Sequence, residues 1–161
     1  MTDRDAVVTA LAGGWFGSGL SPHARSQLAY CAALRPYAAG ELILREGQET
    51  DPFGIVTAGR VALRLLVPER GAVTIMTVEP GDVVGWSALV PPYRSTSTAV
   101  AVESSTLLAF DVGELRRALR DDAELAATVY PRLLEAVARR LGGTRHQLLD
   151  LYAQQAEQMP W

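Results

Sequence analysis

The 161-residue chain has a single cysteine, Cys31. One thiol per chain excludes an intrachain disulfide and a cluster ligated by several cysteines of one chain. No apolar run reaches the roughly 18 to 20 residues that a membrane-spanning helix needs. The N-terminus, MTDRDAVV, is acidic and lacks a signal-peptide pattern, so the expected location is the cytoplasm.

Histidine is almost as scarce as cysteine. The two histidines, His23 and His146, lie toward opposite ends of the chain, so the region between them has no imidazole pair to ligate a metal. No nucleophile stands beside a base in the sequence, and neither a G-x-G-x-x-G pattern nor a Walker loop is present. We therefore expect no metal site and no enzyme activity.

Positive charge is not in excess. The net charge is −3, so neither DNA nor an anionic membrane is an expected partner. Hydrophobic residues make up 48% of the chain and charged residues 20%, as in ordinary globular proteins. The length suits one structural domain with a buried core, made of N-terminal helices (1–34), a strand region (35–111) and C-terminal helices (112–161).

The N-terminal helices are predicted from caps and periodicity. One helix covers Asp5–Ala12, and a second begins after the cap Ser21, with Pro22 in its first turn, and continues to about Leu34. Four apolar side chains recur on one face: Leu20, Ala24, Leu28 and Cys31. The cysteine is therefore expected to be a buried apolar residue rather than a reactive thiol.

Short strands separated by glycines are predicted in the middle of the chain, as an all-β roll, sandwich or barrel requires. The predicted strands are Glu41–Arg45, Phe53–Ala58, Arg60–Val67, Val73–Val78, Val83–Gly85, Thr98–Val102 and Thr106–Asp111. A weak internal repeat relates residues 39–43 to residues 80–84, since in each a turn glycine and an acidic residue precede apolar residues.

The C-terminal part is predicted helical. A short helix covers Val112–Arg120, Asp121 and Asp122 cap the next helix, and a long helix runs from Pro131 to about Gln158. Six residues alternate three- and four-residue spacings: Leu134, Val137, Leu141, Thr144, Leu148 and Leu151. This heptad seam favours pairing with a second copy of the helix. A second apolar face is expected to pack on the strands: Leu133, Ala136, Ala138 and Tyr152.

Two features interrupt the seam. Gly142-Gly143 costs about 1 kcal/mol per glycine relative to alanine in a helix, and either allows close helix approach or acts as a hinge. Thr144 places a hydroxyl on the apolar stripe, where it either contacts a ligand or bonds back to its own helix.

Four segments carry a family resemblance: AGELILREGQ (39–48), IVTAGRVAL (55–63), PGDVVG (80–85) and ARRLGGT (138–144). Together with the order of elements, they resemble the cyclic nucleotide-binding domain shared by the cAMP receptor protein, the regulatory subunits of cAMP-dependent protein kinase and cyclic-nucleotide-gated channels. The resemblance covers about Leu20 to Tyr152. It implies an α+β fold, in which N-terminal helices and a long C-terminal dimerisation helix flank an antiparallel, jelly-roll-like β-roll (a double-stranded β-helix).

The resemblance places the binding cassette after Gly85. In the family a short helix presents backbone N–H groups to the cyclic phosphate, a glutamate after the glycine takes the ribose hydroxyl, and an arginine about ten residues later pairs with the phosphate. Here Trp86 stands at the glutamate position, and Arg94 comes one or two residues before the arginine position, near Ser95 or Thr96.

The register of Arg94 decides whether its side chain faces the pocket. In extended backbone a two-residue shift keeps a side chain on the same face, whereas a one-residue shift turns it away. Trp86 cannot accept a hydrogen bond from a ribose hydroxyl, so core filling or pocket plugging is the leading interpretation and stacking on a base is the second. Thr144 falls where the bacterial activators place a threonine against the adenine, while Arg145 replaces their serine.

The resemblance thus predicts these ligand-binding residues: Gly85, Trp86, Ser87, Ala88, Arg94, Ser95, Thr96 and Thr144. The expected function is a homodimeric sensor that binds cAMP or another cyclic nucleotide and signals through its C-terminal helix to a protein partner. The alternative is an interaction module whose pocket Trp86 closes. The sequence after the long helix leaves no room for a DNA-reading helix-turn-helix domain, so DNA is not an expected partner.

Overall fold

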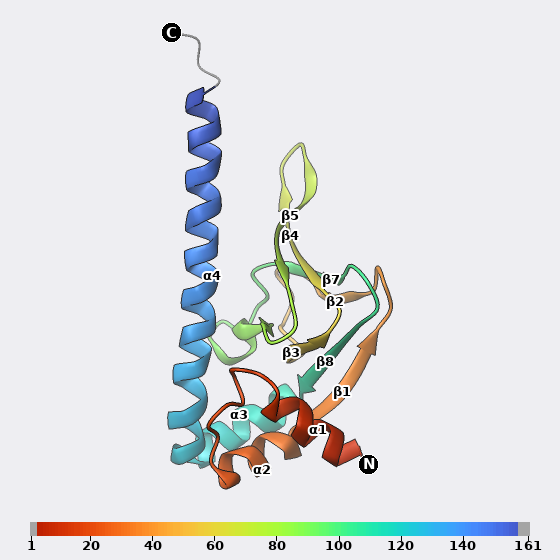
Figure 1. Cartoon of the computed structure of the whole chain (residues 1–161), viewed down its shortest axis with the longest axis vertical. Helices are drawn as coiled ribbons and strands as arrows, with labels where there is room; N and C mark the ends of the chain where they lie inside the picture. Colours follow the sequence, from red (N-terminus) through yellow and green to blue (C-terminus); the bar gives the residue numbers. More distant parts are fainter. Residues whose placement is uncertain (1–2, 158–161) are drawn as a thin grey trace.

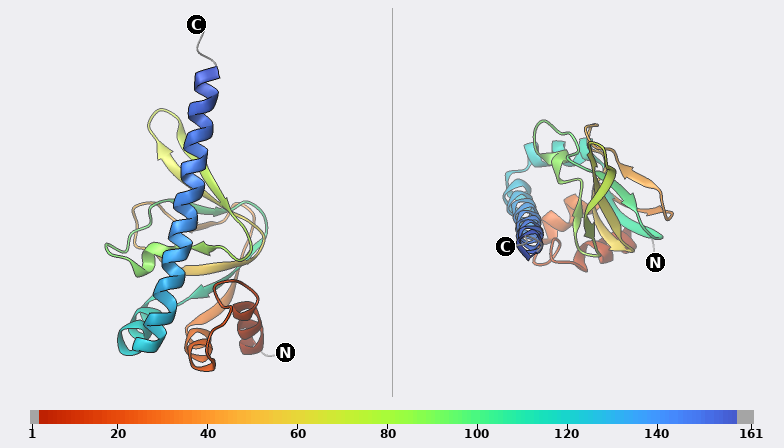
Figure 2. Two further views of the ribbon diagram at one scale, coloured as in Figure 1. Left: turned by 60° about the vertical axis from the view of Figure 1, so that its left-hand side comes forward. Right: turned by 90° about the horizontal axis from the view of Figure 1, so that it is seen from above.

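Eight strands form two four-stranded antiparallel sheets in the computed structural model, which describes residues 3–157 (Figure 1). One sheet has the strand order β1-β8-β3-β6 and the other the order β2-β7-β4-β5. Helices lie at one end of this β-roll, and the long helix α4 runs along one side and beyond it (Figure 2). The predicted α+β fold built on an antiparallel β-roll is confirmed.

Apart from β1, which was not predicted, the strands lie close to their predicted ranges. They are β1 (Ala32–Tyr37), β2 (Leu42–Leu44), β3 (Phe53–Ala58), β4 (Val61–Val67), β5 (Gly71–Val78), β6 (Val83–Val84), β7 (Thr98–Ala101) and β8 (Ser105–Phe110). The helices are α1 (Asp3–Ala12), α2 (Pro22–Tyr30), the 3-10 helix η1 (Trp86–Leu89), α3 (Val112–Asp121) and α4 (Ala123–Glu157).

Apolar side chains are buried in two clusters. One lies between the two sheets and includes Val56, Val61 and Leu107. The other lies between the β1-β8-β3-β6 sheet and the helices, and its aromatic centre joins Phe16 from the loop after α1 to two phenylalanines of the sheet, Phe53 and Phe110. The ring centroids are 6.0 and 5.4 Å apart along this series, a range at which aromatic pairs attract.

The start of α2 is as predicted, but its end is not. The Ser21 hydroxyl accepts a hydrogen bond from the Ala24 N–H at 3.1 Å, and Pro22 is the first helical residue. The helix ends at Tyr30, however, so the prediction of helix as far as Leu34 is wrong. Residues 32–37 instead pair with β8 along their whole length, and those inter-strand hydrogen bonds outweigh a local helical preference.

Cys31 lies between α2 and β1 and is buried, as predicted. Burial, and secondarily the charge of Glu114, raises the pKa of its thiol above the ordinary value. A raised thiol pKa disfavours the nucleophilic thiolate, which agrees with a packing role.

The long helix begins at Ala123, and the prediction that it starts at Pro131 is wrong. Asp122 caps it, since one carboxylate oxygen accepts a hydrogen bond from the Leu125 N–H at 3.0 Å. Leu125 and Val129 are both fully buried in the turns before Pro131. Their burial holds the helix through the proline, whose missing N–H removes one backbone hydrogen bond. The predicted end, Gln158, lies outside the described residues.

Only part of the predicted second face of α4 packs on the domain. Leu133 and Ala136 are buried, whereas Ala138 and Tyr152 are exposed. The reason is length: α4 extends farther than the elements on which its first half packs (Figure 2). Beyond its middle the helix still passes Met76 of β5, next to Gly143. Among the described side chains after Arg140, none is buried.

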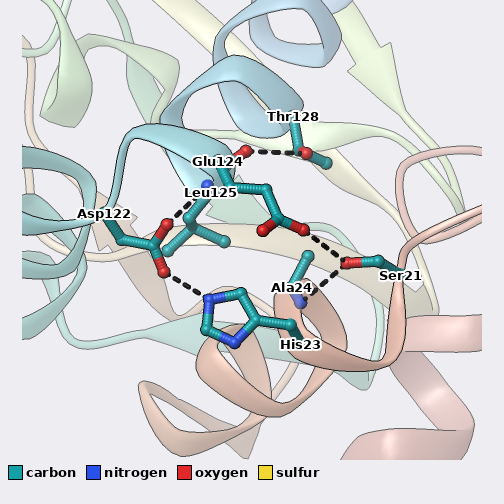
Figure 3. Close-up of polar contacts among 7 residues, drawn as sticks. All are labelled: Ser21, His23, Ala24, Asp122, Glu124, Leu125 and Thr128. Atoms are coloured by element: carbon teal, nitrogen blue, oxygen red, sulfur yellow. Dashed lines mark hydrogen bonds and ion pairs between the residues drawn. The ribbon is translucent and has the colours of Figure 1, made fainter.

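The α2 helix contacts the start of α4 through polar side chains (Figure 3). His23 Nε2 lies 2.5 Å from Asp122 Oδ2, and the Ser21 hydroxyl donates to Glu124 Oε1 at 3.4 Å. Hydrogen bonding to Asp122, followed by its charge, raises the pKa of His23. The Leu125 N–H, followed by His23, lowers the pKa of Asp122. This contact links the N-terminal helices to the junction of α3 and α4.

Candidate functional site

The chain turns sharply at Gly85, between β6 and η1. Its backbone is left-handed, with φ 75° and ψ 34°, a conformation that glycine adopts at little cost. A Cβ atom at this position would lie 2.3 Å from the carbonyl oxygen of Pro52. The turn therefore requires glycine both for its backbone angles and for its close approach to the segment before β3.

Three hydroxyl side chains are buried together beneath this turn: Thr50, Ser87 and Ser95. Thr50 Oγ1 lies 2.8 Å from Ser87 Oγ and 3.0 Å from Ser95 Oγ. Because they bond to one another, the burial of these polar groups is compensated. Sequence reasoning missed Thr50, since no local pattern marks a threonine 37 and 45 residues away from its two partners.

A small cavity adjoins the hydroxyl cluster. It is lined by Leu44, Leu63, Gly85, Trp86, Ser87, Ser95, Thr96, Ser97 and Arg140. Its volume is about 10 Å³, on a measure by which one water molecule needs about 10 to 15 Å³. A hollow of about 400 Å³ lies elsewhere, between α1 and β1, and apolar side chains line most of it. The cavity at Gly85 is the candidate site because polar side chains converge on it.

The structure thus brings five of the predicted ligand-binding residues together: Gly85, Trp86, Ser87, Ser95 and Thr96. It places three others, Ala88, Arg94 and Thr144, outside the cavity lining.

Arg94 points away from the cavity. Its side chain is exposed, and Nη1 donates to the carbonyl oxygen of Gly47 at 2.9 Å. The backbone here is extended, with Arg94 bridged to Glu49 and the Ser95 N–H donating to the Gln48 carbonyl at 2.9 Å. Neighbouring side chains in extended backbone point to opposite faces, so Ser95 faces inward and Arg94 outward.

Trp86 packs against the buried cluster on the helical side of the sheet and also forms one wall of the cavity. This placement agrees with the leading interpretation from the sequence, that the indole fills core space or plugs the pocket. Ala88 is fully buried, and its carbonyl accepts a hydrogen bond from Arg116 Nε at 2.7 Å. The Arg116 guanidinium also stacks over the Tyr93 ring at 4.0 Å, so α3 contacts both ends of the cassette.

Thr144 is exposed on α4, and its hydroxyl donates to the Arg140 carbonyl one turn earlier at 3.0 Å. Of the two roles expected for Thr144, a ligand contact or a bond back to its own helix, the structure shows the second.

Arg140 contributes positive charge to the cavity wall, and sequence reasoning missed it. Its Nη2 donates to the carbonyl oxygen of Val83 at 2.5 Å, just before the Gly85 turn. Burial lowers the pKa of the guanidinium, while the charge of Asp82 acts in the opposite direction. Its position one helical turn before Thr144, within the ARRLGGT segment, is the signal that could have identified it.

The heptad seam of α4 is an exposed apolar stripe. The exposed fractions of its leucines run from 49% for Leu148 to 69% for Leu134. Leu141 and Leu151 are exposed as well, and Val137 is partly buried. The seam therefore lies on the side of α4 that faces away from the β-roll.

Two further properties concern the part of the chain that the structure describes. No group of three or more His, Cys, Asp or Glu side chains there could hold a metal ion. No helix among residues 3–157 combines the length and apolar character needed to cross a membrane.

The family model described as "Cyclic nucleotide-binding domain" matches residues 34–122, more than half of the chain. The chain belongs to the cyclic nucleotide-binding domain family. The match spans β2 to β8, η1 and α3, so it contains the Gly85 cavity except for the wall contributed by α4.

Curated relatives extend this assignment to larger proteins. The chain is 34% identical over 90 residues, 55% of its length, to Acetyltransferase Pat of Mycolicibacterium smegmatis, of which it covers 26%. It is 30% identical over 105 residues, 65% of its length, to the cAMP-dependent protein kinase regulatory subunit of Blastocladiella emersonii, again covering 26%. The chain thus spans about a quarter of the length of these relatives.

Among solved structures, a cyclic nucleotide-binding domain from Methylobacillus flagellatus KT superposes with a TM-score of 0.77. The match covers 91% of this chain and 83% of that chain at 18% identity. It shows that the fold, including the flanking helices, is shared.

Proposed function

We propose that this cyclic nucleotide-binding domain is a regulatory module that binds cAMP or a related anionic nucleotide beneath Gly85 and signals through α4 to a protein partner. The observation that carries the proposal is the convergence of hydroxyl side chains on the Gly85 cavity, within the residues that match the family. Hydroxyl groups donate hydrogen bonds to phosphate oxygens, and Ser87, Ser95 and Thr96 all line the cavity.

The relative from Blastocladiella emersonii supports a regulatory role rather than an enzymatic one, because its name describes a cAMP-dependent regulatory subunit. The choice of cAMP over other cyclic nucleotides belongs to the proposal. So does the cytoplasmic location expected from the sequence.

Homodimerisation through the seam from Leu134 to Leu151 is part of the same proposal. The stripe is apolar, exposed and spaced for helix pairing, so a second copy of α4 would bury it on both chains. Analytical ultracentrifugation at micromolar concentration should give a dimer, and Leu141→Glu combined with Leu148→Glu should give a monomer. A monomeric wild-type chain at this concentration would contradict dimerisation.

A second candidate function is an interaction module that binds no nucleotide. The small cavity volume and the packing of Trp86 against the core favour it, because a nucleotide needs far more space than about 10 Å³. On this alternative, the fold serves only to present α4 to a partner.

Isothermal titration calorimetry of the purified chain with cAMP and with cGMP separates the two. We expect saturable binding of at least one nucleotide, weakened by Ser95→Ala, which removes the buried hydroxyl without adding an atom. Ser104→Ala is the matched control, since its side chain is not in the cavity lining. Binding of neither nucleotide by a folded wild-type chain would sink the sensor proposal and leave the interaction module.

A further inference from the structure

The cavity at Gly85 combines groups from two parts of the chain. The β-roll and η1 supply hydroxyl groups and the glycine turn, while α4 supplies the Arg140 guanidinium. Arg94, the arginine nearest in sequence, donates to a carbonyl outside the cavity. The positive charge beside the hydroxyls therefore comes from a helix that begins about forty residues after the turn.

Arg140 has no carboxylate partner at ion-pair distance among residues 3–157. Its one hydrogen bond in that range goes to the backbone carbonyl of Val83, a neutral acceptor. Arg139, the next residue back, differs in both respects: it forms an ion pair with Glu135 at 2.6 Å and stacks on Trp15 with 4.4 Å to the ring centroid. Asp82 acts on the Arg140 guanidinium only from beyond ion-pair distance. A partly buried guanidinium that forms no ion pair gains strongly from a bound anion, because charge-assisted hydrogen bonds are stronger than bonds to neutral acceptors.

Resting on the proposed function, we infer that Arg140 is the phosphate-binding cation of this domain and that it exchanges the Val83 carbonyl for the phosphate of the bound nucleotide. Arg140 takes the place that sequence reasoning gave to Arg94. Arg140 lines the same cavity as Ser95 and Thr96, so its fork of N–H donors and their hydroxyls can share one phosphate.

The exchange also has a mechanical consequence. Arg140 is the last residue of α4 that bonds to the β-roll in the described structure, since Thr144 bonds only within its own helix. The cavity holds about one water molecule, so a nucleotide enters only when its walls separate. One of those walls is α4. Moving the guanidinium from Val83 to a phosphate therefore repositions the helix relative to β6. This movement couples binding of the nucleotide to the position of residues 141–157 of α4.

The test is isothermal titration calorimetry of the full chain with cAMP and with cGMP. Arg140→Gln should weaken binding of the nucleotide that the wild-type chain binds by about tenfold or more, the loss expected for one charge-assisted hydrogen bond. Arg139→Gln is the matched control and should bind within about twofold of wild type, as should Arg94→Ala, because neither side chain lines the cavity. The affinity of the wild-type chain should fall with rising salt, and Arg140→Gln should flatten this dependence.

Arg140→Gln also loses the bond to Val83, so circular dichroism must show that the variant is folded. If it is not, Arg140→Lys is used, which keeps the charge but lacks the planar fork and should bind with intermediate affinity. Equal nucleotide affinity in wild type and in a folded Arg140 variant would overturn the inference while leaving the proposed function standing. A loss in Arg94→Ala as large as that in Arg140→Gln would also overturn it. Binding of neither nucleotide by the wild-type chain would overturn the proposed function and this inference together.

Discussion

The two halves of α4 differ in everything except their helical conformation. Residues 123–140 are held by the domain: Leu125, Val129 and Leu133 are buried, and Arg140 bonds to β6. Arg132 adds bonds from its guanidinium to the carbonyls of Phe16 at 2.7 Å and Ser18 at 2.6 Å. Residues 141–157 continue the same helix past the β-roll without a buried side chain among those described (Figure 1).

Packing of an apolar face supplies most of the stability of helices in proteins. The anchored half has such a face on its own domain. The free half carries an equally apolar stripe, including Leu141, Leu148 and Leu151, that no described element of this chain covers. The contrast indicates that the first half is part of the packed domain, whereas the second half is free for the helix pairing proposed above.

The largest expected effect is a difference in stability loss between two leucine truncations, one in the anchored half and one in the free half. Leu125→Ala should lower the free energy of unfolding by about 2–5 kcal/mol, because the fully buried side chain leaves a cavity. Leu149→Ala, off the heptad seam and exposed, should change it by no more than about 0.5 kcal/mol. Urea denaturation followed by circular dichroism measures both. Equal losses would contradict the division of α4 into an anchored and a free half.

A smaller effect is expected where the two halves meet. A Cβ atom at Gly142 would have no neighbour within 4 Å. Gly142→Ala should therefore stabilise the chain by up to about 0.5–1 kcal/mol by raising helix propensity. Gly143→Ala is the companion variant, since its Cβ would meet only the Met76 Cε, at an ordinary 3.4 Å. Thermal unfolding monitored at 222 nm checks both, and destabilisation by Gly142→Ala would point instead to close helix approach at this site.

The smallest effect concerns the polar contact at the start of the anchored half. The folded pKa of His23 is raised, so its contribution to stability is complete below the ordinary value of 6.5 and is lost as the pH rises through the raised value. The folded pKa of Asp122 is lowered, so its contribution is present above the ordinary value of 3.8 and is lost as the pH falls through the lowered value.

His23→Ala should therefore flatten the decline of stability as the pH rises above 6.5. His146→Ala removes the other histidine, from the exposed free half, and serves as the control. Denaturation midpoints measured across this range test the contact. A variant profile that overlays the wild-type profile would show that the His23–Asp122 pair does not contribute.

Local sequence signals predicted most of the fold. The strand Phe53–Ala58 was predicted with its observed bounds, and the cap at Ser21 was predicted correctly, because both depend on residues adjacent in the chain. The strand Ala32–Tyr37 was not predicted. Its exposed positions give no alternating apolar pattern, and it forms only through pairing with β8, which lies at the far end of the strand region. The start of α4 was misplaced because Pro131 resembles a helix start, whereas burial of Leu125 carries the helix through it.

The sequence predicted only the part of the candidate site that comes from one continuous segment, the one that begins at Gly85. The turn at Gly85 and the hydroxyl run after Arg94 follow from the family resemblance, and they lie in the cavity wall. The inward position of Ser95 depends on the extended backbone between Glu49 and Arg94, which pairs residues far apart in sequence. Thr50 and Arg140 come from other segments altogether, so only the folded chain places them beside the cassette.

Hydrogen exchange of the wild-type chain, with and without saturating cAMP, tests most directly whether the Gly85 cavity is coupled to α4. The account predicts altered exchange in two places at once, residues 83–89 around the cavity and the turns of α4 around Arg140. Binding of cAMP, verified by calorimetry, that alters exchange in residues 83–89 but leaves α4 unchanged would contradict the account.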